Sequence, residues 1–160
     1  MNYLRISLGI LAILAASRFI PHPPNFTSLI ALTFYVPIFL GLRYLPALII
    51  SFIITDFVIG YHSLTHWTWG SVFLIGLISQ YFNINKFYRF FGASISVLIF
   101  FFVTNFGVWT GGSYGYSLEG FVNCYILAIP FLGNNLLATL MFSLIIELIN
   151  VNYRKFLQTN

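Results

Sequence analysis

Residues 90–108 read FFGASISVLIFFFVTNFGV, an apolar run that contains no charged side chain. A helix needs roughly 20 mainly apolar residues to cross the hydrocarbon core of a bilayer, so this run by itself predicts a transmembrane helix. A strand of a membrane barrel would alternate polar and apolar residues, and this run does not. Five further apolar runs lie along the chain, at residues 3–20, 26–42, 45–59, 69–82 and 131–149.

The composition of the chain indicates the same class. Hydrophobic residues make up 59% of the 160 residues and charged residues only 6%, whereas a soluble domain has about 25% charged residues. A globule of this size cannot bury so much apolar surface, so the surplus must face lipid. We therefore predict a single integral membrane domain over residues 1–160, an all-α transmembrane bundle of six helices.

Glycine and proline mark the ends of several runs. Gly60 stands where the third helix should end, and we predict that it is the C-terminal cap. The fourth run is short, so its helix must include Trp67 to cross the membrane. Residues 118–129 are apolar enough for a short helix, but Pro130 and Gly133 interrupt the run there. We predict an external or re-entrant half-helix at this point, before the last span.

The basic residues set the predicted orientation, because cytoplasmic loops of membrane proteins are enriched in Lys and Arg. Only Arg18 falls on one side of a six-span model, and the other basic residues share the opposite side: Arg5, Arg43, Lys86, Arg89, Arg154 and Lys155. The N- and C-termini are therefore predicted to be cytoplasmic. A seventh crossing by residues 118–129 would move Arg154 and Lys155 outside, so we reject it.

Asp56 is the most informative polar residue, because it lies about one helical turn before the outer end of the third span. A carboxylate near a helix C-terminus opposes the helix dipole, and burial in lipid adds a large desolvation cost if it is unpaired. We expect Asp56 to have a partner, either Arg18 or a histidine. Two interpretations stay open, a structural Asp56–Arg18 ion pair and a functional group, and both can hold.

The other costly polar residues of the spans converge on the external side, while the cytoplasmic half offers little beyond Glu147 and loop residues. Such a one-sided cluster is what an outward-opening pocket needs. We assign eight residues to a ligand-binding site: Arg18, His22, Asn25, Asp56, His62, Asn105, Trp109 and Asn134.

Structural roles compete with this assignment at several positions. Asn25 can be the N-cap of the second span, with Thr27 and Ser28 as rivals, and Asn134 and Asn135 can cap the last span. The tryptophans, including Trp67, Trp69 and Trp109, can simply anchor the protein at the external membrane interface. Imidazoles at His22, His62 and His66 with Asp56 can bind a divalent metal, but their spacing matches no strong motif, and we assign no metal site.

Several functions are disfavoured by what the sequence lacks. There is no Walker lysine loop, nucleophile elbow or zinc-protease motif, so we predict neither an ATPase nor another enzyme, and no cofactor. Cys124 is the single cysteine and cannot form an internal disulfide; we predict a buried structural thiol. The few basic residues are scattered between apolar runs, so we expect no nucleic-acid partner.

Three segments carry a family resemblance: RFIPHPPNFT at residues 18–27, DFVIGYH at 56–62 and TNFGVW at 104–109. The chain resembles, from Arg18 to about Ile149, an uncharacterised bacterial family of small six-span membrane proteins. That family is similar to the substrate-binding S components of energy-coupling-factor (ECF) vitamin transporters. The resemblance implies a multi-pass protein of the bacterial cytoplasmic (inner) membrane.

The resemblance to S components also implies a function. It implies a six-helix protein that holds a vitamin or its precursor near the external face. It further implies docking on a transmembrane scaffold protein through Ala12 and Ala16, with ATP-binding subunits supplying the energy. From the residues alone, these two alanines form a small-residue face that lets another helix approach closely in lipid.

We therefore expect the substrate-binding membrane subunit of a small-molecule importer, with lipid and a small-molecule ligand as its other partners. Two alternatives stay open. One is a structural scaffold subunit of an envelope complex, which predicts a tightly packed interior. The other is a divalent metal carrier that uses His22, His62 and Asp56.

Overall fold

A computed structural model describes residues 3–159, apart from the side chains at positions 157 and 159. Within that range the chain is all-α, with seven α-helices, two short 3-10 helices and no strand. The elements in order are α1 (Tyr3–Phe19), α2 (Leu29–Leu40), η1 (Leu42–Tyr44), α3 (Leu45–Ile59), α4 (Thr65–Ile78), η2 (Ser79–Phe82), α5 (Lys86–Thr110), α6 (Leu118–Leu127) and α7 (Ile129–Thr159).

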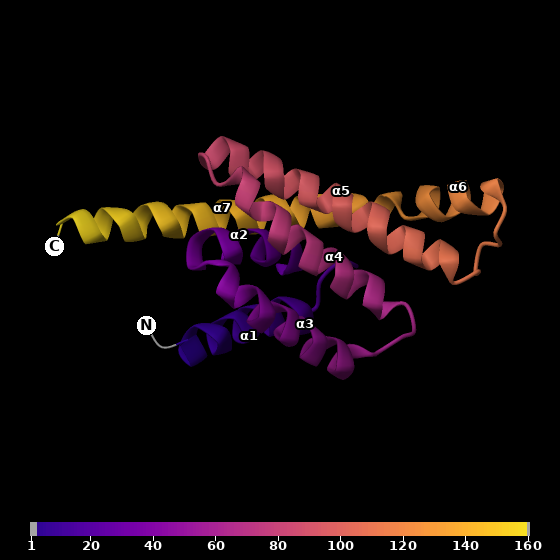
Figure 1. Ribbon diagram of the computed structural model, residues 1–160, viewed down its shortest axis with the longest axis horizontal. Coiled ribbons are helices and arrows are strands. Elements are labelled where there is room, and N and C mark those ends of the chain that lie inside the picture. The colour runs from indigo at the N-terminus through magenta and orange to yellow at the C-terminus, as the bar shows by residue number, and fades with distance from the viewer. Residues whose placement is uncertain (1–2, 160) are drawn as a thin grey trace.

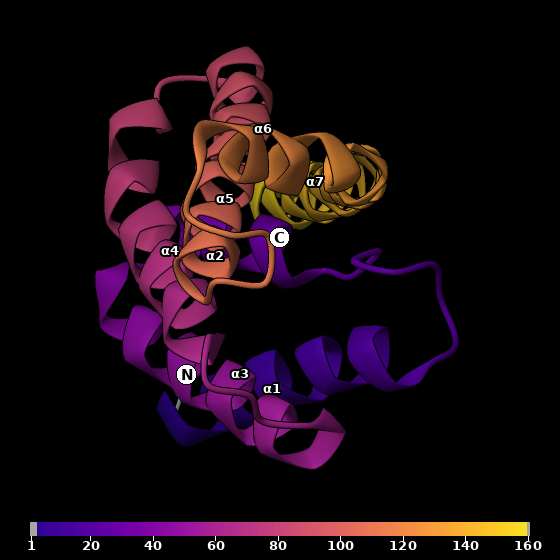
Figure 2. The same ribbon diagram turned by 90° about the vertical axis from the view of Figure 1, so that its right-hand side faces the viewer.

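All the α-helices except the short α6 run along the long axis of the molecule and alternate in direction, so both ends of the chain lie at the same end of the bundle (Figure 1). Seen along that axis, α1 and α3 lie together on one side and α5, α6 and α7 on the other, with α2 and α4 between them (Figure 2). The helix α6 lies at the end of the bundle opposite the termini.

The helix α2 is the centre of the core. Every residue from position 29 to 38 is buried, including Phe34 and Tyr35, and the helix packs against α4, α5 and α7. Its apolar residues cover all sides, which is typical of a helix that is surrounded by protein. The helix is short, at 12 residues, and only its last residues Phe39 and Leu40 are not fully buried.

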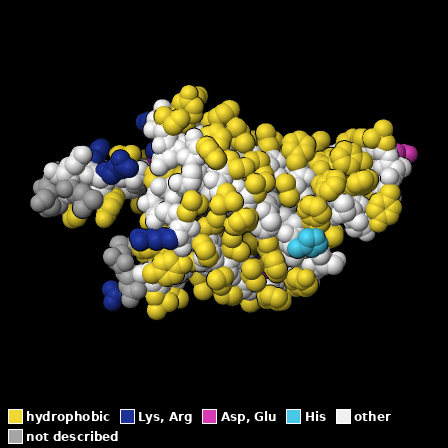
Figure 3. Space-filling view, viewed as in Figure 1, with side chains coloured by type: hydrophobic (Ala, Val, Ile, Leu, Met, Phe, Trp, Pro, Cys, Tyr) yellow, Lys and Arg dark blue, Asp and Glu magenta, His cyan; other side chains and the backbone are white. Residues whose placement is uncertain are grey.

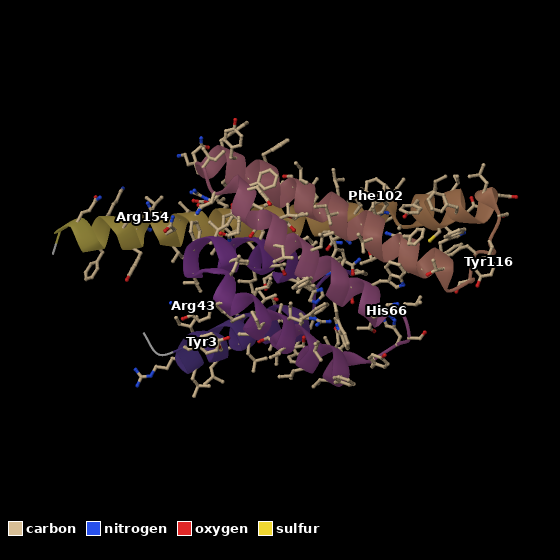
Figure 4. The ribbon with its side chains drawn as sticks, viewed as in Figure 1. Tyr3, Arg43, His66, Phe102, Tyr116 and Arg154 are labelled. Carbon is tan, nitrogen blue, oxygen red and sulfur yellow. The ribbon has the colours of Figure 1, made fainter. Side chains whose placement is uncertain are left out.

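Three helical segments are long and apolar enough to cross a membrane: Leu42–Ile59, Lys86–Thr110 and Ile129–Phe156. Hydrophobic side chains cover much of the molecular face in Figure 3, as expected of a multi-pass membrane protein. Basic side chains gather at the end that carries the termini, where Arg43 and Arg154 lie, and His66 and Tyr116 lie at the other end (Figures 3 and 4).

Several predicted helix boundaries are confirmed. Gly60 caps α3 with a φ of 146°, a backbone conformation that favours glycine. The helix α4 starts at Thr65 and therefore includes Trp67, as the short fourth run required.

Cys124 is a buried free thiol whose Sγ lies 3.5 Å from the carbonyl oxygen of Asn105.

The start of the last helix differs from the prediction. The helix α7 begins at Ile129, with Pro130 in its first turn and Gly133 inside it, so neither residue interrupts it. Proline is tolerated there because the N–H groups of a first helical turn have no partner within the helix. Asn134 and Asn135 consequently lie in the second turn, and the prediction that they cap this helix was wrong.

The proposed cap at Asn25 was also wrong. Ser28 occupies the N-cap position of α2, and the Thr27 hydroxyl accepts a hydrogen bond from the Leu29 backbone N–H at 3.4 Å. Asn25 lies further back in the loop, with a positive φ of 64°. Asparagine adopts that conformation more readily than most residues, and it leaves the side chain free of a capping role.

Candidate functional site

A buried ion pair joins the last turns of α1 and α3. Arg18 Nη2 lies 2.6 Å from Asp56 Oδ1, and Arg18 Nη1 donates to the Thr55 hydroxyl at 2.5 Å. The second carboxylate oxygen, Asp56 Oδ2, accepts a hydrogen bond from the Trp69 indole at 2.7 Å. Asp56 is only 6% exposed, so the Arg18 guanidinium and the Trp69 indole replace the water that an ionised carboxylate would otherwise hold.

The helix directions explain the pairing. The helices α1 and α3 pack side by side and point the same way, so their C-terminal turns meet (Figure 1). A positive charge such as that of Arg18 interacts favourably with the dipole at a helix C-terminus, whereas the negative charge of Asp56 interacts unfavourably. The guanidinium, which lies next to both C-terminal turns, therefore offsets the dipoles of both helices. The guanidinium also lies over the Phe52 ring, 4.6 Å from its centroid. The expectation that Asp56 has a partner is confirmed, and the partner is Arg18.

Two adjoining cavities lie beside this ion pair. The first has a volume of about 290 Å³ and is lined by Arg18 and Asp56 together with His22, Asn25 and His62. The second, of about 300 Å³, extends towards α5 and α6. The two cavities share the lining residues Asn25, His62, Thr68, Phe100 and Asn135.

Three of the shared lining residues carry polar side chains without a partner. Within the part of the chain that the structure describes, no hydrogen bond engages the side-chain amides of Asn25 and Asn135 or the imidazole of His62. Asn135 is the most deeply placed, at 8% exposure. The Asn135 amide can hydrogen-bond to water or to a ligand in the cavity, whereas Asn25 and His62 are exposed residues.

A family model matches residues 2–156 of this sequence. The chain belongs to DUF6580, a family of unknown function. The match spans both partners of the Arg18–Asp56 pair and every residue that lines the two cavities. No curated protein and no solved structure matches the chain. The expected membership of an uncharacterised family is thus confirmed, and the comparisons show no link from this DUF6580 chain to S components.

The cavities bring together six of the eight predicted ligand-binding residues of this DUF6580 member. Arg18, His22, Asn25, Asp56 and His62 line the first, and Asn25, His62 and Asn105 line the second. The His22 ring nitrogens lie 2.7 Å from the Pro23 carbonyl oxygen and 3.3 Å from that of Arg18. Asn105 Nδ2 donates to the carbonyl of Phe101, one turn back in α5, at 2.7 Å.

Trp109 and Asn134 lie outside both linings. The Trp109 indole packs edge-on against Phe121 of α6, with 5.4 Å between ring centroids. Asn134 Nδ2 donates to the carbonyl of Pro24 at 3.0 Å and so ties α7 to the loop that carries Asn25. This tether gives Asn134 a structural contact next to the site.

Sequence reasoning missed Asn135 as a lining residue. Successive residues of a helix are rotated by about 100°, so only one of two adjacent asparagines can face a given cavity. The missed signal is a polar repeat at every fourth residue, Asn135, Thr139, Ser143 and Glu147, which marks one face of α7.

A second buried ion pair was also missed. Arg89 Nε and Nη2 lie 2.5 and 2.8 Å from Oε1 and Oε2 of Glu147, and the guanidinium lies over the Phe39 ring. From the sequence, Arg89 is predicted only as one of the basic residues that set the topology. The signal was Glu147 itself, because a carboxylate in an apolar span needs a nearby cation.

Two further predictions concern metal binding and partner docking. Among the residues that the structure describes, no three His, Cys, Asp or Glu side chains gather as a metal site. Ala12 and Ala16 are exposed on the outside of α1, away from the core.

Proposed function

We propose that this DUF6580 member binds a small polar metabolite, such as a vitamin or a precursor, in a membrane cavity that opens to the outside. It would act as the substrate-binding membrane subunit of an importer of the ECF S-component type. The observation that carries the proposal is the cavity beside the Arg18–Asp56 pair, into which unpartnered amide and imidazole groups converge.

The arrangement of the helices supports six crossings. The helices α1, α2 and α4 run beside α3, α5 and α7 at the same depth of the bundle (Figure 1). If the three long helices cross the bilayer, their neighbours lie within it too. The basic side chains at the end with both termini then favour a cytoplasmic position for that end. The cavity beside Arg18 lies towards the other end and would open outward.

The chemistry of the cavity favours a ligand with little net charge. Asp56 and Arg18 neutralise each other, so neither is free to pair with a charged group. The free groups are the amides of Asn25 and Asn135 and the imidazole of His62, which donate and accept hydrogen bonds. Phe52 and Phe100 add apolar walls. A small neutral or zwitterionic molecule with a ring meets these requirements.

The scaffold hypothesis predicts a tightly packed interior at the position of this cavity. Two adjoining open pockets of about 290 and 300 Å³ lie there instead, which supports a binding site over a filled interior. The exposed alanines of α1 suit a docked membrane partner, and co-purification with such a partner would address the importer part of the proposal.

A thermal-shift screen of the purified protein in detergent tests ligand binding. The panel consists of water-soluble vitamins and their precursors. A ligand at 100 times its dissociation constant stabilises a protein by about 2.7 kcal/mol. We expect at least one compound to raise the unfolding temperature of the wild type, and the shift to be lost in Asn135→Ala.

Asn123→Ala is the matched control, because Asn123 is exposed on α6 and lines neither cavity. This variant should keep the full ligand shift. Binding that is equal in Asn135→Ala and Asn123→Ala would place the ligand elsewhere. A wild type that no compound stabilises would argue for the scaffold alternative.

A further inference from the structure

The buried face of α7 is polar. Five α7 residues are buried among those whose side chains are described, and four of them are Asn135, Thr139, Ser143 and Glu147. Their four-residue spacing keeps them on one side of the helix. The residues on the lipid side are largely apolar. A transmembrane helix that turns its polar residues inward is typical of proteins that move ions or solutes.

The hydroxyls along this face make no hydrogen bond of normal geometry, although the Tyr35 hydroxyl lies within reach of Ser143 and Glu147. Thr139 Oγ1 and Ser143 Oγ are buried without a hydrogen bond, and so is the hydroxyl of Tyr35 on α2. Tyr35 lies near Ser143 and Glu147. Each buried hydroxyl without a partner costs free energy, and water molecules are the usual way to satisfy such groups. Water molecules placed between Thr139, Ser143 and Tyr35 would satisfy these hydroxyls.

Cavities lie at both ends of this face. Asn135 lines the two outer cavities. Glu147 and Lys86 line a separate open pocket of about 410 Å³ near the other end of the bundle, whose remaining walls are the apolar residues Phe87, Phe90, Leu144, Leu148 and Val151. The helix rises by about 18 Å over the twelve steps from Asn135 to Glu147. That distance is more than half of a hydrocarbon core of about 30 Å.

We propose that this face of α7 is a hydrated proton path from the outer cavity to Glu147 and the inner cavity. A proton passes from oxygen to oxygen along the hydroxyls and their water molecules, each oxygen receiving one proton and giving up another. At the end an O–H bond forms on the Glu147 carboxylate. Release of that proton to the inner cavity restores the carboxylate, so the step needs no other reactant.

The charged surroundings of Glu147 favour a proton over a metal cation. Arg89 pairs with the carboxylate, Lys86 lines the same inner cavity, and the Tyr35 hydroxyl is the nearby titratable group on α2. Two positive groups at the inner end repel a sodium or potassium ion, whereas a proton bonds covalently to the carboxylate. Protonation also weakens the bidentate pair with Arg89, which makes this pair a gate for the path.

The proton path does not depend on the identity of the ligand, and it would give this protein direct access to the transmembrane proton gradient. A flux assay on the full-length protein in liposomes tests it without any ligand. The vesicles contain a pH-sensitive dye, and a potassium gradient with valinomycin drives protons inward. We expect faster acidification with wild type than in protein-free vesicles, and a fall to the protein-free rate for Glu147→Gln.

Ser143→Ala and Thr139→Val should slow the flux as well, since each removes one hydroxyl of the path. These two variants keep the test valid if Glu147→Gln does not fold. Glu119→Gln is the control, because Glu119 is exposed on α6 outside the path, and its flux should equal that of the wild type. Wild-type flux no faster than in protein-free vesicles, or equal flux in all variants, would overturn the proposal. Either result would leave the ligand-binding test unaffected.

Discussion

The Trp69 indole donates a hydrogen bond to Asp56 Oδ2 at 2.7 Å, on the carboxylate oxygen that Arg18 does not hold. This contact ties α4 to α3 at the wall of the first cavity. Arg18 ties α1 to the same carboxylate, so Asp56 joins three helices. The site is therefore held in place by groups that come from well-separated parts of the chain.

Trp69→Phe removes the indole N–H while it keeps an aromatic ring. A hydrogen bond to a charged group contributes about 1.5–3 kcal/mol, so we expect a loss of stability in that range. Thermal unfolding in detergent measures it. Trp67→Phe is the control, because Trp67 packs on Phe106 through its ring. Equal losses of stability in the two variants would show that the hydrogen bond from Trp69 to Asp56 does not stabilise the protein.

Replacing one partner of the Arg18–Asp56 pair should be more damaging than replacing both. Arg18→Met or Asp56→Asn leaves the other charge buried and unpaired, which costs about 3–5 kcal/mol. The double variant removes both charges, so its unfolding temperature should lie above that of at least one single variant. Strictly additive losses in this double-mutant cycle would contradict an interacting pair.

Two helical glycines should respond to alanine in opposite directions. A Cβ at Gly120 would overlap the backbone of Tyr114 and Gly115, which cannot move aside easily, so Gly120→Ala should destabilise the end of the bundle that holds α6. A Cβ at Gly133 meets nothing within 4 Å. Gly133→Ala should therefore stabilise α7 by about 0.5–1 kcal/mol. Unfolding temperatures that move the same way in both would contradict this packing.

Cysteine labelling tests the proposed orientation. Ser63 is exposed between α3 and α4, and Asn83 is exposed between η2 and α5 at the opposite end of the bundle. In a Cys124→Ser background, a membrane-impermeant maleimide should label Ser63→Cys in intact cells, and Asn83→Cys only after permeabilisation. The reverse pattern would invert the topology and close the outward cavity to external ligands.

The sequence was sufficient to locate the main helices and to predict that Asp56 has a partner, either Arg18 or a histidine. Long apolar runs locate helices because a helix satisfies its backbone groups within one segment, whereas the strands of a closed barrel alternate polar and apolar residues. Asp56 required a cation for the same energetic reason, and topology placed Arg18 within reach. The short central helix α2, all of whose residues from 29 to 38 are buried, shows that an apolar run does not reveal which helix faces lipid.

The inner polar residues could not be placed so easily. Arg89 looks like a loop residue because it lies close to the start of its helix, yet that first turn packs against α7 and buries it beside Glu147. Asn134 and Asn135 are adjacent and differ only in the direction in which they leave the helix axis. The sequence could not show which of them faces the cavity, because the start of α7 was not known. The helix α7 starts at Ile129 and contains Pro130 in its first turn. The sequence alone was equally compatible with a helix that is interrupted at Pro130.

The most direct test of the account is the accessibility of Thr68, which lines both outer cavities. Thr68→Cys in the Cys124→Ser background is treated in intact cells with a small, membrane-impermeant thiol reagent. We predict labelling from the outside that slows when a stabilising compound from the vitamin panel is present. Labelling only after permeabilisation, or an external rate that no such compound changes, would contradict an outward-facing ligand cavity beside Arg18 and Asp56.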